Sequence, residues 1–453
     1  MAAITTDSAP STTVPPLSMS LRAKLSIMMF LQFAVWGSWF TILGNYLKHL
    51  GFTDPQVGAM YALMPLGAIF ATLFAGQIAD RLLASEKVMA ICHLAGAGLL
   101  FWMAQVKSPE QYWLLWGISL AYALLYNPTL ALSNTIAFTH VPSGERDFPS
   151  VRVFGTIGWI VAGLLVGNVL STEAVPAFQT SKPFYLAAGF SAVLGVISLV
   201  MPHTPPQGKA GEGIPFLKAL ALFKDPSFAV FFLVSFLITI VLAFYYSFTG
   251  TFLELGAGVT DVAGTMTIGQ FAELALLPFL PWFLKTMKMR WVLALGMFCW
   301  GLRYLLFAFG GPGPELMANA TLAQKVSYAF AVIPSPFMLV LIGVALHGIC
   351  FDFFFAAGFI HVDNTAPKEI RGSGQALFSF LTYGVGMWMG SILSGYVAEF
   401  SKVPGPDGKM VINWTTFWLI PASGVILALI AFLIFFRPKA KAEVAGVIPM
   451  TEV

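Results

Sequence analysis

Long apolar runs recur along the whole chain, and their length restricts what it can fold into. Each run holds about 20 residues, which is the length that an α-helix needs to cross the hydrocarbon core of a bilayer. Charged residues make up only 10% of the chain and hydrophobic residues 58%, whereas a soluble protein carries about 25% charged residues. We therefore expect an all-α, polytopic membrane protein.

The apolar runs predict twelve transmembrane helices. The predicted spans are 24–47, 55–79, 87–106, 110–139, 150–171, 183–202, 227–254, 261–284, 290–310, 334–362, 372–400 and 413–436. A longer polar segment at 203–226 divides them six and six. Its first part is rich in Pro and Gly, and its second part has the pattern of a short amphipathic helix.

The distribution of Lys and Arg predicts the orientation in the membrane. With the N-terminus inside, the cytoplasmic segments hold nearly three times as many Lys and Arg residues as the outer loops, as the positive-inside rule requires. We therefore expect both termini in the cytoplasm, and a bacterial protein of this kind would lie in the inner membrane. The net charge of +3 gives no indication of a nucleic-acid partner, and none is expected.

The cysteines and the catalytic motifs argue against an enzyme. Cys92, Cys299 and Cys350 all lie within apolar runs, so we interpret them as small core residues without disulfides. The sequence has no HExxH, GxSxG, Walker or paired-cysteine pattern. A membrane-embedded enzyme is therefore a weak alternative, and no metal or cofactor is expected.

The two groups of six spans show a weak internal repeat. The fourth span ends with FTHV (138–141) and the tenth with FIHV (359–362), and each is followed by a loop containing Pro and Arg and then by a Gly-rich span. Two six-helix halves related as parallel repeats are the architecture of major facilitator transporters. The loop GQIADR (76–81) resembles a loop motif of that superfamily, although an ordinary charged turn would look the same.

This architecture gives a division of the chain into five parts. Pairs of glycines four residues apart in spans five and eleven, Gly163 with Gly167 and Gly386 with Gly390, predict close helix packing. The expected parts are a disordered cytoplasmic N-terminus (1–20), an N-terminal six-helix half (21–202), a cytoplasmic linker (203–226), a C-terminal six-helix half (227–436) and a cytoplasmic tail (437–453).

A few polar residues interrupt the apolar spans. A charged side chain at mid-bilayer costs about 2.5–3.5 kcal/mol on insertion scales, so such residues usually face a cavity or a partner. Glu273 lies three residues after Gln270, which places both on one face of span eight. In span ten, Asp352 follows His347 by five residues, and Phe351 shares the face of His347.

Span five offers a third polar stripe. Arg152 opens the predicted span, with Thr156 and Trp159 four and seven residues later on the same face. Spans five, eight and ten would all line the central cavity of a facilitator fold. Together they offer a cation, two carboxylates, an amide, a hydroxyl, an imidazole and aromatic faces.

Each polar residue also has a structural interpretation. Arg152 would then be a cytoplasmic anchor beside Arg146 and Asp147, and Gln270 would form a hydrogen bond with a neighbouring helix. The two acids would be members of structural ion pairs. Two further polar residues inside the spans are better explained as structural than as substrate ligands, namely His93 and Arg303.

Several segments resemble one known family across nearly the whole chain, in order. They are FLQFAVWGSWFTILGNYL (30–47), AICHLAGA (90–97), NPTLALSNTI (127–136), DFPSVRVFGTIGW (147–159) and FDFF (351–354). These segments are similar to those of the nucleoside:proton symporters of bacteria. The resemblance implies that the nucleoside is held in the central cavity by residues matching Arg152, Thr156, Gln270, Glu273, Phe351 and Asp352.

The chain departs from the family pattern at several substrate-facing positions. Span seven has Ala243 and Tyr246 where the best-known members carry amide side chains. His347 stands where they have a tyrosine, and Trp159 replaces a phenylalanine. The resemblance therefore extends the expected binding set to Trp159, Tyr246 and His347, while these changes leave the choice of nucleoside open.

The favoured function is proton-coupled uptake of nucleosides by alternating access, driven by the proton gradient and performed by a monomer in the lipid bilayer. Burial disfavours the charged form of a carboxylate, so Asp352 and Glu273 are the candidates for proton coupling. The alternative is a facilitator of another small solute, such as a sugar or a drug-like compound, with export as one option. The altered residues of span seven favour that alternative.

Overall fold

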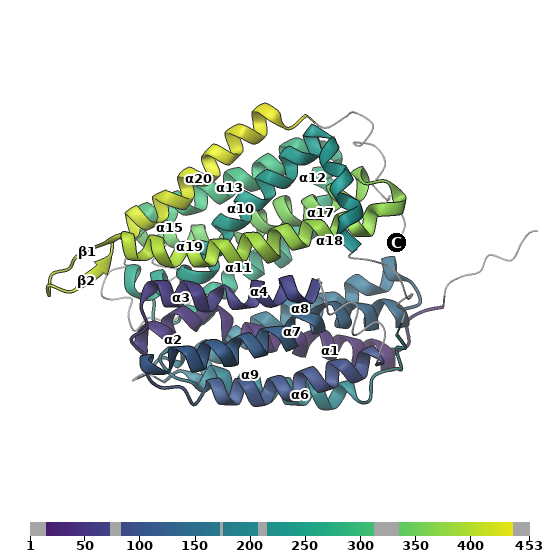
Figure 1. Cartoon of the computed structure of the whole chain (residues 1–453), viewed down its shortest axis with the longest axis horizontal. Helices are drawn as coiled ribbons and strands as arrows, with labels where there is room; N and C mark the ends of the chain where they lie inside the picture. The colour runs from purple at the N-terminus through teal and green to yellow at the C-terminus, as the bar shows by residue number, and fades with distance from the viewer. Residues whose placement is uncertain (1–14, 73–82, 173–174, 207–214, 312–334, 438–453) are drawn as a thin grey trace, which may run out of the picture.

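The computed structural model describes residues 15–72, 83–172, 175–206, 215–311 and 335–437. Helices account for nearly all of the regular structure, as Figure 1 shows. The exception among these residues is one antiparallel hairpin, β1 (Lys402–Pro404) with β2 (Met410–Ile412), in which Val403 pairs with Val411. The facilitator-like loop at 76–81 lies outside the described residues.

The helices that precede the linker begin two residues earlier than the predicted start of the N-terminal half. They are α1 (Met19–Gly37), η1 (Phe40–Ile42), α2 (Leu43–His49), α3 (Asp54–Tyr61), α4 (Leu63–Phe70), α6 (Ser85–Met103), η3 (Pro109–Gln111), α7 (Tyr112–His140), α8 (Gly144–Leu164), η4 (Leu165–Leu170), η5 (Ala177–Gln179) and α9 (Lys182–Ser198).

The linker contributes a short 3₁₀ helix, η6 (Pro215–Lys224), where a short amphipathic helix was predicted. The elements after it are α10 (Pro226–Thr251), η7 (Phe252–Gly256), α11 (Val262–Leu276), η8 (Leu277–Phe279), α12 (Leu280–Thr286), α13 (Met289–Phe309), α15 (Pro336–Ala345), α16 (His347–Phe351), η10 (Asp352–Ala356), α17 (Ala357–Thr365), η11 (Lys368–Ile370), α18 (Arg371–Ser379), η12 (Phe380–Gly386), α19 (Met387–Phe400) and α20 (Trp414–Phe435).

Among the described residues, 10 helical segments are long and apolar enough to cross a membrane. Helix α9 is a shorter apolar helix of 17 residues. The predicted span 55–79 begins with α3 and α4, and part of it lies outside the described residues. The membrane-spanning, all-helical class is therefore confirmed.

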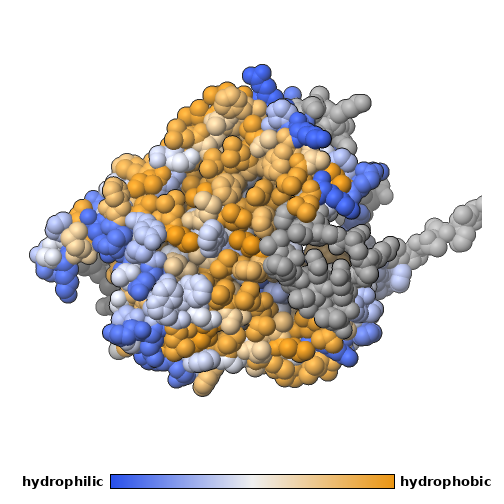
Figure 2. All heavy atoms as spheres, in the orientation of Figure 1, coloured by the Kyte–Doolittle hydropathy of each residue, from blue (hydrophilic) through white to orange (hydrophobic). Residues whose placement is uncertain are grey.

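The outer surface of the helices is apolar. Figure 2 shows hydrophobic residues across the middle of the molecule, whereas hydrophilic residues collect at the hairpin end and at the opposite end. Large side chains such as Trp102, Trp113 and Leu427 are more than half exposed. Such a surface is unfavourable in water and suits the hydrocarbon core of a bilayer.

The helices form two groups (Figure 1). Those up to α9 lie in one group and those from α10 onward in the other, and the start of α1 lies at the end opposite the hairpin. Within the first group α1 packs along α8 and α6 along α9, while in the second α13 packs along α20. Helices α8 and α11 meet across the two groups.

The glycine pairs lie at close helix contacts, as predicted. A Cβ atom on Gly390 would run into the backbone of Ile240 and the side chain of Ala243 in α10, and one on Gly163 would meet Thr267 of α11. Small residues at such points let helix backbones approach closely.

Two predicted continuous spans are interrupted. Span eight changes from α11 through the 3₁₀ turn η8, which contains Pro278, into α12. Span ten breaks at Leu346 between α15 and α16 and then widens into the π-helical turn η10 at Asp352. Interior prolines remove a backbone donor and break or kink helices, and π-turns frequently lie at functional sites.

Candidate functional site

Glu273 of α11 and His347 of α16 face each other between the two helices. The His347 Nε2 atom lies 3.9 Å from the Glu273 Oε2 atom. The imidazole is almost fully buried, while the carboxylate keeps 22% of its side-chain surface exposed. The exposed part of Glu273 is therefore available to a ligand, and His347 forms one wall beside it.

Two glycines bring these side chains together. A Cβ atom on Gly348 would lie 2.6 Å from the backbone carbon of Ala272, and one on Gly269 would lie 2.9 Å from the Cβ atom of His347. Real side chains do not tolerate such distances, so α11 and α16 can approach this closely only because both positions lack a side chain.

Asp352 lies one residue after the end of α16, at the start of η10. It is 1% exposed, and its Oδ2 atom has no hydrogen-bond partner among the described residues. The carboxylates of Asp352 and Glu273 are close enough to interact electrostatically. A buried carboxylate without a full set of hydrogen bonds is costly as an anion, and protonation removes that cost.

Arg152 lies inside α8 rather than at the start of span five. The helix begins at Gly144 and is capped by Ser143, whose side chain accepts from the backbone of Arg146. The predicted start at 150 is therefore six residues too late, because a charged first turn belongs to this helix. The Arg152 guanidinium lies 4.2 Å from the ring centroid of Phe33 in α1.

The surroundings of Arg152 differ from those of Arg146 in the first turn of the same helix. Arg146 forms its own ion pair with Asp147 at 2.8 Å. Arg152 is instead partly buried and interacts electrostatically with Glu273 across the two helix groups. The charges of Arg152 and Glu273 are therefore close enough to influence each other.

The remaining predicted residues lie on α8, α10 and α11. Trp159 packs edge-on against Trp36 at 5.3 Å, and Tyr246 meets the His347 ring edge-on at 6.2 Å. Gln270 is buried, and its Oε1 atom has no hydrogen-bond partner among the described residues. Thr156 is partly exposed on α8.

Phe351 completes the aromatic side of the site. Its ring stacks on His347 with centroids 5.7 Å apart, as expected for two residues one helical turn apart. Phe351 is partly exposed, in contrast to Phe353 and Phe354, which are buried. A flat ligand would therefore find an aromatic face here next to two carboxylates.

His93 has the structural role that the sequence predicts. Its two ring nitrogens lie 3.1 Å from the Ser191 hydroxyl and 2.9 Å from the Gln32 side-chain oxygen. These partners provide a hydrogen-bond contact for each ring nitrogen within the first group of helices, whereas Glu273 and Asp352 belong to the second group.

The sequence did not point to several residues that shape the site. Phe33 supports Arg152, Tyr245 stacks on His347 with centroids 5.2 Å apart, and Gly269 and Gly348 set the helix contact. The only available signal was the position of each glycine directly beside a predicted site residue. Apolar phenylalanines and tyrosines in a membrane span give no comparable signal.

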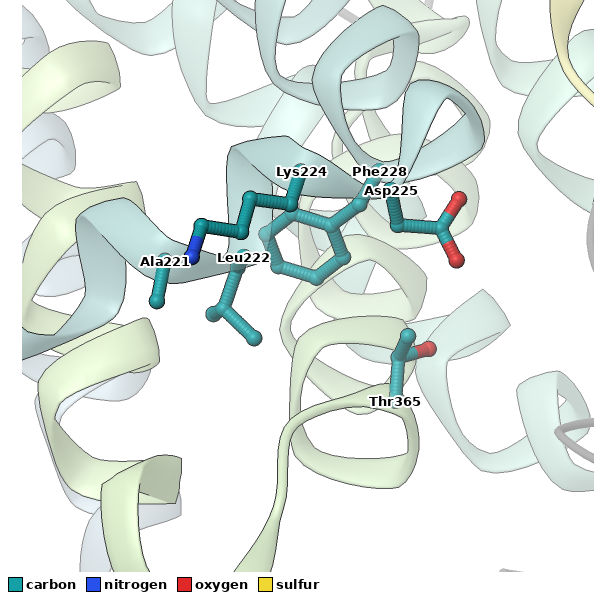
Figure 3. A pocket seen from close by; sticks show the side chains of 6 residues that line it. All are labelled: Ala221, Leu222, Lys224, Asp225, Phe228 and Thr365. Carbon is teal, nitrogen blue, oxygen red and sulfur yellow. The ribbon is translucent and has the colours of Figure 1, made fainter.

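A separate small pocket lies under the linker, where η6 meets α10 and α17. Figure 3 shows its lining residues, which are Ala221, Leu222, Lys224, Asp225, Phe228 and Thr365. It contains none of the residues predicted for the substrate site. Elsewhere in the described ranges, no group of three or more His, Cys, Asp or Glu side chains is arranged to hold a metal ion.

The sequence matches known transporters over almost its whole length. Residues 19–441 match the family model described as nucleoside H⁺ symporter. The xanthosine permease of Escherichia coli (strain K12) is 32% identical over 437 residues, covering 92% of this chain and 96% of the permease. The nucleoside permease NupG of the same organism is 32% identical over 440 residues, covering 93% and 97%.

Solved structures agree with these matches. The crystal structure of the nucleoside transporter NupG superposes with a TM-score of 0.78 at 31% identity, covering 93% of this chain and 100% of that one. The POT family transporter PepTSo superposes with a TM-score of 0.64 at 14% identity, covering 91% of this chain and 97% of that one, which shows a shared fold alone. The chain belongs to the nucleoside H⁺ symporter family, a family of membrane transporters.

Proposed function

We propose that this chain takes up nucleosides together with protons, using the residues around Glu273 as its binding and coupling site. One observation carries the proposal: His347 of α16 lies 3.9 Å from Glu273 of α11. The charges of Arg152 and Asp352 are close enough to Glu273 to influence it. Family membership supports the substrate class, and the geometry supports the assignment of residues.

The nucleoside would be held by hydrogen bonds and aromatic contacts. Carboxylates and amide oxygens accept hydrogen bonds from ribose hydroxyls or base N–H groups. Glu273 and the unpaired Oε1 atom of Gln270 can act in this way, while Arg152 and Thr156 can donate. Aromatic faces stack on bases, which is worth about 1–3 kcal/mol where it has been measured.

The proton would be carried by Asp352 or Glu273. Either acid can take up a proton when the site faces the outside and release it when the site faces the inside. The two carboxylates interact electrostatically, so we expect them to titrate as a coupled pair rather than independently. The charge of Arg152 favours the ionised form of Glu273 and would assist release.

The transport cycle would use two six-helix halves. We propose twelve spans, which the linker at 203–226 divides into halves at 21–202 and 227–436. Both termini would lie in the cytoplasm. The ten described spans and α9 support this count, and the two groups of helices in Figure 1 support the division. A monomer provides both halves of the site.

Contacts between the two groups at the hairpin end support a state that is closed to the outside. Lys402 of β1 lies 2.9 Å from Asp54 of α3, and His49 lies 2.6 Å from Glu254. Asn45 donates to the backbone of Gly250 and to Glu254. In an alternating-access cycle these contacts must break before substrate can enter from that end.

The proposal is tested with purified protein in liposomes and labelled nucleosides. With an inward proton gradient, the vesicles should accumulate nucleoside above the external concentration. An uncoupler should abolish this accumulation but leave exchange across the membrane. Accumulation that persists without a gradient would contradict proton coupling.

A second candidate is transport of another small solute. Ala243 is fully buried against Gly390 and offers no side-chain polar group, and Tyr246 presents an aromatic ring at the site. A span-seven surface of this kind would suit a less polar ligand. Competition of unlabelled sugars and of less polar, drug-like compounds against labelled nucleosides in the same vesicles would separate the two candidates.

A further inference from the structure

Arg303 is a fully buried cation in span nine that the proposed mechanism does not use. It lies in α13 and is 0% exposed. Among the described residues its partners are two backbone carbonyls and two aromatic rings rather than a carboxylate. Because a charge inside a membrane is costly, this arrangement calls for an explanation beyond packing.

The first contact of Arg303 is with the break in span ten. Its Nε atom donates to the carbonyl oxygen of Gly343 at 2.8 Å, and an Nη atom donates to that of Val344 at 3.3 Å. Both carbonyls belong to the last turn of α15, and the Val344 carbonyl also accepts from the backbone N–H of Leu346 at the C-cap. The planar fork of a guanidinium can reach two adjacent acceptors, which a lysine cannot do in the same way.

The second contact of Arg303 is with span seven. The guanidinium carbon lies 3.9 Å from the ring centroid of Tyr245. The same ring stacks on His347, with an interplanar angle of 16°. The imidazole therefore rests on a ring that Arg303 holds through a cation–π contact.

Two neighbouring residues of α13 add hydrogen bonds to spans ten and seven. Trp300 donates from its indole nitrogen to the carbonyl oxygen of Cys350 at 3.1 Å, and Tyr304 donates to that of Val241 at 2.8 Å. Span nine is thereby tied to span ten on both sides of Leu346, and to span seven.

We propose that Arg303 is a positioning residue for nucleoside binding, because it fixes both the break in span ten and the tyrosine ring that supports His347. This inference rests on the proposed function and assigns a new role within that site. His347 begins the helix directly after the break. The direction of its Nε2 atom toward Glu273 depends on where α15 ends and on how the ring beneath it is held.

A double-mutant cycle tests the inference in the full-length protein. Calorimetry measures the Kd for whichever of uridine, cytidine, adenosine and inosine the wild-type protein binds most tightly. Arg303→Gln should raise this Kd about tenfold. In a His347→Ala background the same substitution should change the Kd by less than about twofold, because effects that act through one residue are not additive.

The matched control is Arg290→Gln. Arg290 lies on the same helix, and its guanidinium donates to the carbonyl oxygen of Leu433 in α20, away from span ten. Its substitution removes the same charge and should leave the Kd unchanged. Equal losses for Arg303→Gln in both backgrounds, or an unchanged Kd in the wild-type background, would overturn the inference.

A second pair of variants covers the case in which Arg303→Gln does not fold. Tyr245→Leu removes the ring between Arg303 and His347 and should also raise the Kd about tenfold, whereas Tyr245→Phe keeps the ring and should restore most of the affinity. Similar Kd values for the two variants would count against the inference. A wild-type protein that binds none of the four nucleosides would instead overturn the proposed function, and this inference with it.

Discussion

Asp352 is the residue whose chemistry most directly separates binding from coupling. It is buried, and its Oδ2 atom lacks a hydrogen-bond partner among the described residues. An amide in its place has nearly the same shape and can still accept a hydrogen bond, but it cannot take up a proton at physiological pH.

Asp352→Asn should therefore keep nucleoside affinity within about tenfold, or about 1.4 kcal/mol, and lose gradient-driven uptake. The pH dependence of transport should flatten at the same time. Calorimetry and liposome uptake on the same purified variant measure both effects. Asp363→Asn is the control, because Asp363 lies on the next segment of the same span, is half exposed and pairs with Arg371.

Two other outcomes have clear meanings. If affinity and transport fall together, Asp352 is a substrate ligand, because an ionised acceptor makes a stronger hydrogen bond than an amide. If the variant still concentrates nucleoside, Asp352 does not carry the proton, and Glu273 is the remaining buried acid to test.

At this scale the sequence was informative wherever a polar residue interrupts an apolar span. Glu273, Asp352 and His347 could be selected because their burial in a membrane is costly unless they have a role. Tyr245 and Phe33 could not, because their contribution is a face presented to another side chain. That contribution depends on which helices become neighbours in the fold. The spacing of residues along one helix does not specify this.

Helix contacts at the site depend on Gly348 of α16. A Cβ atom there would lie 2.7 Å from the backbone nitrogen of Glu273 and even closer to Ala272. Because the obstacle is backbone rather than a mobile side chain, the helices themselves would have to separate.

Gly348→Ala should therefore destabilise the protein by about 1–3 kcal/mol, the usual cost of overpacking. It should also weaken nucleoside binding, since Glu273 would move away from His347. Thermal unfolding and calorimetry measure the two effects. The control is Gly98→Ala in α6, where a Cβ atom would meet nothing within 4 Å. Equal melting temperatures for the two variants would show that α11 and α16 are not tightly packed at Gly348.

The spans and their interruptions differ in how far the sequence predicts them. Apolar length predicted the spans well, because the bilayer thickness sets it. The prolines of span eight carried a local signal for its interruption. The break at Leu346 carried none, because it is stabilised by Arg303 from another helix. The hairpin β1–β2 was not predicted, although its Pro- and Gly-rich turn is a recognisable signal.

Ion pairs and hydrogen bonds join the two groups of helices at the hairpin end. Asp54 is completely buried and forms ion pairs with Lys48 and Lys402, at 2.8 and 2.9 Å. Burial lowers the pKa of Lys402, but hydrogen bonds with Glu399 and Asp54 outweigh it, so the pKa is raised overall. Lys402 therefore remains charged, and the contact persists across physiological pH.

These contacts bear on transport because a ligand entering from the outside binds only the outward-open state. The apparent dissociation constant equals the intrinsic one divided by the fraction of molecules in the competent state. An interaction that stabilises the closed state therefore weakens apparent affinity from that side, and its removal should strengthen it.

Lys402→Ala should accordingly lower the external KM for nucleoside in right-side-out vesicles. A partly exposed ion pair contributes up to about 1 kcal/mol, which corresponds to a change of up to about fivefold. The control is Lys409→Ala, because Lys409 lies in the same hairpin turn and pairs only with the exposed Asp407 at 3.9 Å. If both variants change the external KM equally, the effect comes from surface charge. If only Lys402→Ala changes it, then Lys402 and Asp54 form a gate, and the substrate must wait for their separation before it reaches Glu273.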